Sequence, residues 1–175
     1  MSQTNIVPIT SDEFKRILKA CDEHRNKNNR LRLRALVLLM YYSGLAIRDA
    51  VTLKQDHIKN GKLFPRRTKT GTDVLCPLPG EALVALKQIG SETEYFFWSG
   101  KSKAKSAVGD YQRALKTVFE EANTQRVFPH LFRHTFITNL LTAGVPIKTV
   151  AALVGHSSTK MTMKYSHWMK RGRRA

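Results

Sequence analysis

The chain has 175 residues, 42% of them hydrophobic, which suits one globular domain with a substantial core. Thirty Lys and Arg against thirteen Asp and Glu give a formal charge of +17. A surplus of that size favours a polyanionic partner, with nucleic acid ahead of an anionic membrane, although a basic protein without such a partner would have the same composition.

Membrane and secretion signals are missing from the sequence. The longest apolar run, Ala35 to Tyr42, is too short to cross a bilayer, and the first ten residues lack the layout of a secretory signal. Cys21 and Cys76 both lie in apolar patterns. They indicate reduced core thiols in a cytosolic protein rather than a disulfide framework.

The first quarter of the chain predicts three helices. Thr10 followed by Glu13 is a capping box, and the next apolar residues recur at helical spacing through Cys21. Residues 24–30 form a polar break with no periodicity. The second helix, 31–42, is apolar almost all round and is expected to be the buried central helix, ended by Gly44 in a left-handed cap. A third helix is expected over about 47–54.

The middle of the chain predicts a small sheet. Asn60-Gly61 is a strong hairpin signal, and a second reversal at 69–72 leads into a third strand ending at Cys76. Arg66, Arg67 and Lys69 are expected on the middle strand. These elements form a three-stranded antiparallel sheet.

The remainder of the chain is predicted to be helical. A short helix follows Pro79, residues 95–98 form a strand or a core plug, and a long helix begins at Ser106. Further helices are expected over 130–142 and 146–154, and a last one, capped by Ser157 or Ser158, is expected to hold Tyr165. The fold class is therefore α+β: a mostly helical single domain with one small antiparallel sheet.

The most informative stretch begins with His130-Leu-Phe-Arg133-His134. At spacings of three and four, the three polar side chains share one face of a helix start. Free N–H groups and the dipole at a helix start favour an anion, and a guanidinium suits phosphate oxygens. The alternative is a structural histidine pair with a surface arginine.

Two later residues, His156 and Tyr165, could likewise have either a structural or a catalytic role. His156 follows a glycine after an apolar helix and could simply cap that helix. Tyr165 could be a core aromatic, and a phenol is a poor nucleophile unless cationic neighbours and a proton acceptor assist it.

The combination is more specific than its parts. HxxRH, then LVGH, then a tyrosine nine residues after that histidine resembles the signature of the tyrosine recombinases, the phage-integrase family. Lys69 stands where the family has a hairpin lysine, and Tyr42-Ser-Gly-Leu45 resembles its Gly-Leu-Arg junction. The resemblance extends from about Ile9 to Trp168 and implies the catalytic-domain fold of that family.

The resemblance implies site-specific DNA recombination without metal or other cofactor. Tyr165 would attack a phosphodiester, leaving a 3′-phosphotyrosyl link and a free 5′-hydroxyl. Arg133 would hold the non-bridging oxygens and His156 would hydrogen-bond the phosphate. His130 would assist proton movement at the tyrosine, and Lys69 would protonate the departing oxygen.

One family position is filled differently. The pattern Gly-Leu-Arg-Ile-x-Glu has Ala46 in place of its arginine, whereas Asp49 matches the acidic position. Arg48 lies roughly 200° round a helix from residue 46. Either Ala46 is an engineered replacement that disables the chemistry and spares the fold, which the matching surroundings favour, or it is a natural variant in which Arg48 or a residue from elsewhere supplies the charge.

Two other functions compete with recombination. Residues 141–155 resemble a helix-turn-helix, so the chain could be a DNA-binding module without chemistry. A metal-dependent nuclease is less favoured, because the six histidines have no carboxylate cluster at metal-ligand spacing.

The resemblance also implies partners and domain limits. Double-stranded DNA is the expected partner, with Arg66, Arg67, Thr70 and Lys164 as candidate contacts and a tetramer on two DNA sites as the assembly. The N-terminal DNA-clamping domain of the family has no counterpart in these 175 residues, and residues 1–9 and 169–175 are expected to be flexible ends. A prokaryotic or phage origin and a cytoplasmic, nucleoid-associated location follow.

Overall fold

A computed structural model describes residues 6–64, 75–156 and 158–166. The first two helices are α1 (Ser11–Glu23) and α2 (Lys27–Ser43). The predicted capping box is confirmed, because the Thr10 side chain accepts a hydrogen bond from the Glu13 backbone while Glu13 bonds the Thr10 backbone. The predicted polar break at 24–30 is partly wrong. Asn26 caps α2 through a bond from Asn28, so the helix begins at Lys27.

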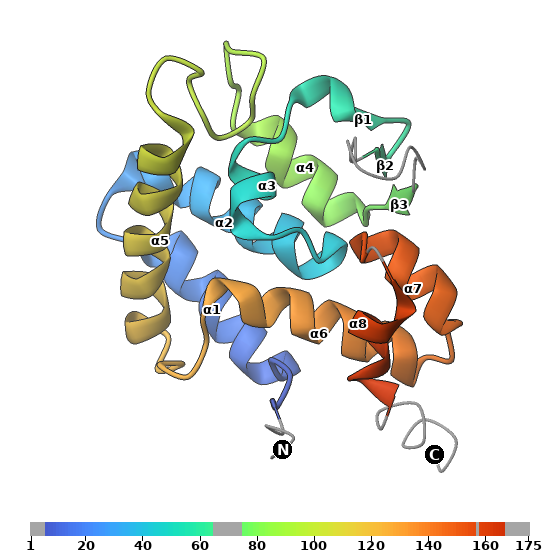
Figure 1. Cartoon of the computed structure of the whole chain (residues 1–175). Helices are drawn as coiled ribbons and strands as arrows, with labels where there is room; N and C mark the ends of the chain where they lie inside the picture. Colours follow the sequence, from blue (N-terminus) through green and yellow to red (C-terminus); the bar gives the residue numbers. More distant parts are fainter. Residues whose placement is uncertain (1–5, 65–74, 157, 167–175) are drawn as a thin grey trace.

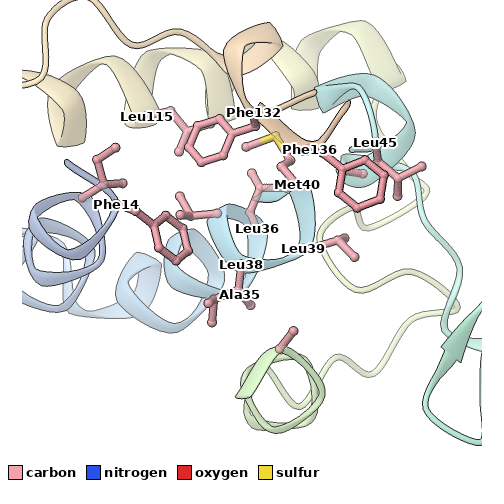
Figure 2. Close-up of a cluster of buried hydrophobic side chains, with 14 of the residues drawn as sticks. Phe14, Ala35, Leu36, Leu38, Leu39, Met40, Leu45, Leu115, Phe132 and Phe136 are labelled. Carbon is pink, nitrogen blue, oxygen red and sulfur yellow. The ribbon is translucent and has the colours of Figure 1, made fainter. Parts of the chain in front are cut away.

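Helix α2 is the centre of the core, as predicted. It packs against α1 and α6 on one side and α4 on the other (Figure 1). The side chains of Leu33 and of every residue from 35 to 40 have no exposed surface. Figure 2 shows these side chains reaching Phe14 of α1, Leu115 of α5 and Phe132 of α6. One helix therefore fixes the positions of the others.

The α2 end is shaped by Gly44. Its φ of 65° is left-handed, as predicted for the cap, and its N–H donates to Met40 O at 3.0 Å. A Cβ at this position would lie 2.5 Å from Phe136 Cδ1. Both the conformation and the close packing of α6 thus require glycine here. Helix α3 (Ile47–Val51) follows and is shorter than the predicted 47–54.

The small antiparallel sheet is confirmed. Its strands β1 (Ile58–Lys59), β2 (Lys62–Leu63) and β3 (Cys76–Pro77) are hydrogen-bonded in the order β1-β2-β3. Ile58 pairs with Leu63, and Leu63 pairs with Cys76. Asn60 and Gly61 both have positive φ, as a two-residue hairpin turn requires. The predicted second reversal and the basic residues of the hairpin lie outside the described residues.

Helices make up most of the remaining described residues. A 3₁₀ turn (Gln55–His57) precedes the sheet, and α4 (Gly80–Gln88), α5 (Ala104–Glu121), α6 (Pro129–Thr142), α7 (Ile147–Val154) and α8 (Thr159–Met163) come after it. Residues 95–98 are mainly the predicted core plug, since Phe96 and Phe97 are buried. One prediction is wrong: α8 ends before Tyr165, which lies in the turn after it.

Hydrogen bonds fix the residues that precede α1. The Arg126 guanidinium donates hydrogen bonds to Val7 O and Pro8 O and pairs with Glu13, and the Ile9 N–H bonds Thr135 Oγ1 at 2.9 Å. The chain leading into α1 is thereby attached to α6. No helix in the described residues is long and apolar enough to cross a membrane.

Candidate active site

The start of α6 presents the three polar residues that the sequence singled out. Phe128 is the N-cap and Pro129 the first helical residue, so His130, Arg133 and His134 lie on the first two turns. The opposite face is fixed by the buried Leu131 and Phe132. His130 is exposed, whereas Arg133 and His134 are half-buried. The two imidazole rings meet edge to face, with centroids 4.8 Å apart.

Arg133 joins three distant segments. Its Nη1 donates to Gly44 O at 3.0 Å and its Nη2 donates to Val154 O, so α6 is tied to the ends of α2 and α7. Burial lowers the pKa of Arg133, while the Asp49 carboxylate and the Tyr165 phenol raise it in part. The shift leaves an arginine fully charged at neutral pH. The guanidinium is therefore a fixed cation whose plane is set by two backbone carbonyls.

Tyr165 is brought to the same place by the turn after α8. Its hydroxyl is hydrogen-bonded to His134 Nδ1, and the two ring centroids are 5.3 Å apart. The ring packs against the edge of the core. Burial raises the pKa of Tyr165, and the charge of Arg133 lowers it in part. The phenol thus has a cation nearby and a proton acceptor in direct contact.

His156 lies in the connection between α7 and α8. Gly155 ends α7 in a left-handed conformation, and the His156 N–H bonds Ala151 O at 2.9 Å. The His156 Nδ1 is hydrogen-bonded to Thr162 Oγ1 at 2.7 Å, and Thr162 has no exposed surface. Since Val154 holds Arg133, His156 is two residues from a carbonyl that Arg133 contacts.

The α2–α3 junction supplies the position of the missing arginine. Ala46 is the half-buried N-cap residue of α3, and its methyl group makes no capping hydrogen bond. Arg48 and Asp49 are exposed on the first turn of α3. The carboxylate of Asp49 raises the pKa of Arg133, which places it in the electrostatic surroundings of that guanidinium. The junction therefore presents an acidic group and a backbone carbonyl to Arg133.

The electrostatics keep the imidazoles neutral. Burial, then His130, then the charge of Arg133 lower the pKa of His134 to about 4. Although His130 is exposed, partial desolvation of its ring by the surrounding protein, and then the charge of Arg133, lower its pKa as well. At pH 7 Arg133 is thus a guanidinium, the His130 and His134 imidazoles are neutral and the Tyr165 phenol is neutral, which suits an anion and a proton transfer.

Some predicted site residues remain outside this picture. Lys69, Arg66, Arg67 and Thr70 lie outside the described residues, and Lys164 is exposed beside Tyr165. Within 6–64, 75–156 and 158–166, no three His, Cys, Asp or Glu side chains gather as a metal site would.

Sequence reasoning gave no role to His134, which contacts the phenol, or to Thr162, which holds His156. His134 was visible within HxxRH, but only the folded chain shows which histidine of that motif meets a residue 31 positions away.

Comparison with known proteins gives the chain its family. The model of the phage integrase family matches residues 8–171. Tyrosine recombinase XerA of Thermococcus kodakarensis is 30% identical over 166 residues, covering 90% of this chain and 57% of the relative. A tyrosine recombinase of Thermosipho africanus is 32% identical over 163 residues, covering 91% and 56%. The chain thus spans a little over half the length of these curated relatives.

Solved structures have the same fold. A crystal structure of XerA recombinase superposes with a TM-score of 0.73 at 24% identity, covering 96% of this chain and 63% of that one. The catalytic domain of bacteriophage HP1 integrase gives 0.68 at 22% identity, covering 94% and 89%. With a family model that matches nearly the whole length and a fold that agrees, this chain belongs to the phage integrase family.

Proposed function

We propose that this domain cuts and rejoins double-stranded DNA in site-specific recombination, through a covalent 3′-phosphotyrosyl intermediate on Tyr165. The observation that carries the proposal is the contact of the Tyr165 hydroxyl with His134, beside the carbonyl-bound guanidinium of Arg133. The names of the relatives, tyrosine recombinases, support the same chemistry. Because the phosphotyrosyl ester keeps the energy of the broken bond, rejoining needs no nucleotide cofactor.

Arg133 is proposed to bind the non-bridging oxygens of the phosphate. An arginine has five N–H donors, and the bonds to Gly44 O and Val154 O use two of them. The remaining donors would meet the charge that develops on phosphorus. A donor held rigidly before the reaction costs little reorganisation, which is what makes it effective in the transition state.

The other roles follow from position. His156, fixed by Thr162, is proposed to hydrogen-bond the phosphate. His130 is proposed to assist proton movement at Tyr165 from one step away, because its ring contacts His134. Lys69 is proposed as the general acid for the departing 5′-oxygen. With Ala46 in place of an arginine, we expect slow cleavage by this chain.

Double-stranded DNA is the proposed partner, supported by the formal charge of +17. Arg66, Arg67, Thr70 and Lys164 are candidate contacts. We expect binding mainly to phosphates, so affinity should fall steeply with salt. A tetramer on two DNA sites and association with the nucleoid of a prokaryotic cell are proposed from the family and from its prokaryotic relatives.

The test is covalent capture on nicked DNA that contains a cognate site. Denaturing electrophoresis after long incubation should show a protein–DNA adduct that survives EDTA and is lost in Tyr165→Phe. Tyr95→Phe is the matched control: Tyr95, whose backbone pairs with Lys54, lies outside the cluster, so loss of its hydroxyl should keep the adduct. Absence of an adduct even with Ala46→Arg, alongside retardation on native gels, would support a helix-turn-helix reader instead.

A non-catalytic reader has weaker support. Residues of α6 and α7 do form two helices joined through Gly144, as such a module needs. That function gives no reason for a half-buried phenol bonded to an imidazole, nor for a guanidinium held by two carbonyls. The cluster around Arg133 favours chemistry.

A further inference from the structure

His134 is the histidine that meets the phenol. Its Nδ1 is hydrogen-bonded to the Tyr165 hydroxyl, and its ring lies at 42° to the Tyr165 ring. His130, one helical turn earlier, is exposed and reaches this pair only through the His134 ring. The two histidines of the same motif therefore stand at different distances from the nucleophile.

We propose that His134 orients the Tyr165 phenol and accepts its proton as the phenol attacks, an inference that rests on the proposed function. The Tyr165 O–H bond breaks and its proton moves to His134 Nδ1, while the phenol oxygen bonds to phosphorus. The P–O5′ bond breaks and the departing oxygen takes a proton from the proposed general acid, Lys69. In rejoining, the imidazolium returns its proton to the phenol oxygen.

This role requires a free lone pair on Nδ1 of His134. The neutral ring must then carry its hydrogen on Nε2, so that the phenol donates and the imidazole accepts. Burial is the largest cause that lowers the His134 pKa, and the titratable and charged groups that lower it further are His130 and then Arg133. At pH 7 the ring is neutral, and the lone pair is available.

The charge of Arg133 also couples the proton transfer to DNA. Without an anion, burial, then His130, then the charge of Arg133 make His134 a weak base, and the phenol stays protonated. A phosphate bound at Arg133 would offset that positive charge and raise the basicity of His134. The phosphate would thus make proton transfer from Tyr165 to His134 easier, by removing the contribution of Arg133 to the low His134 pKa while burial and His130 keep theirs.

The matched variants are His134→Gln and His130→Gln, two neutral replacements on one helix face. Adduct formation should fall at least about a hundredfold at pH 7 in His134→Gln, the usual scale for loss of a positioned proton acceptor. Its rate should then rise about tenfold per pH unit toward the phenol pKa, because the phenolate must form without help. His130→Gln should lower the rate less and keep the flatter profile.

A substrate with sulfur in place of the departing 5′-oxygen separates the two proton transfers. A thiolate leaves without a general acid, so this substrate should restore adduct formation in a variant that lacks the proposed general acid, Lys69. It should not restore adduct formation in His134→Gln. Rescue of His134→Gln by the sulfur substrate would overturn the proposal. So would faster adduct formation in His134→Gln, since the contact would then restrain the phenol.

A second measurement needs no turnover. In ¹⁵N NMR spectra of the DNA-free protein, His134 should be the Nε2–H tautomer, and Tyr165→Phe should shift its Nδ1 resonance. A hydrogen on Nδ1 would overturn the proposal. If an adduct forms and depends on Tyr165 while His134→Gln keeps the normal pH profile, only this inference fails; if no adduct forms in any background, the proposed function fails with it.

Discussion

Arg133 binds two regions of the molecule that are built in different ways. The α2–α3 junction, which supplies Gly44 O, belongs to the core: Leu45 is one of the buried side chains (Figure 2), and Gly44 packs against Phe136. The described residues that follow Val154, up to Tyr165, have less apolar burial. Within α8 only Thr162 is buried, and Met161 and Met163 are about half exposed.

This difference places the proposed nucleophile on the less buried side. The junction is held by apolar packing, whereas Tyr165 and His156 are only half-buried and are hydrogen-bonded to His134 and Thr162. Segments with few buried apolar contacts open at a lower free energy than the core. The core therefore holds the Arg133 guanidinium in a fixed position, through Gly44 O. The Tyr165 phenol, which is bonded to His134, belongs to a segment that can open locally without unfolding the core.

Hydrogen exchange should show the largest effect. Amides of α2 are expected to exchange only through global unfolding, and those of α8 through local opening, at least about a thousandfold faster (~4 kcal/mol). Native-state exchange followed by mass spectrometry measures both in one experiment. Equal protection of the two helices would mean that α8 is as much a part of the core as α2.

The next effect concerns residue 46 in the rigid region. Ala46→Arg should raise adduct formation at least about a hundredfold, because it adds one preorganised donor beside Arg133 (~3 kcal/mol). The substitution breaks no capping hydrogen bond, since the Ala46 side chain makes none at the start of α3. Arg48→Ala is the control. If Ala46→Arg brings no gain and Arg48→Ala abolishes the adduct, Arg48 supplies the charge.

Local signals predicted much of the rigid region. The Thr10–Glu13 capping box, the left-handed Gly44 and the Asn60-Gly61 turn each depend on a few neighbouring residues, and all three are confirmed. The start of α2 was missed because Asn26 caps a polar first turn that has no apolar period. The hydrogen bond of the Asn26 cap, and not the hydrophobic pattern, sets where α2 begins.

The other region could be predicted only in part. The HxxRH and LVGH strings indicated which residues belong together, but not their contacts. That Tyr165 falls after α8, and meets His134 rather than His130, depends on how α6 and α8 pack. The bonds of Arg133 to Gly44 O and Val154 O are equally invisible, because a backbone carbonyl leaves no mark in a sequence.

A glycine pair tests how the rigid region supports Arg133. Gly44→Ala and Gly144→Ala both place alanine at positive φ, which lowers the free energy of unfolding by about 1–2 kcal/mol. Only at residue 44 would the new methyl group meet Phe136, while residue 144 has nothing within 4 Å. We expect Gly44→Ala to cost about 2–3 kcal/mol more in urea unfolding, the scale of overpacking, and to weaken the adduct. Equal costs would show that Phe136 yields without strain.

The smallest effect is a pH dependence of the contact that holds Tyr165. The folded-state pKa of His134, about 4, is below the unfolded value near 6.5, so the fold favours the neutral ring. The resulting stability is present above pH 6.5 and is lost as the pH falls toward 4, by about 2 kcal/mol once solvent screening is allowed for. Urea unfolding at pH 7 and pH 4.5 should show the loss, and His134→Gln should reduce it.

Because a protonated His134 cannot accept a hydrogen bond from the phenol, amide hydrogen exchange in α8 should speed up over the same pH range, while α2 keeps its greater protection. A decline in stability that is the same in His134→Gln would assign the titration to another group and leave the phenol contact independent of pH.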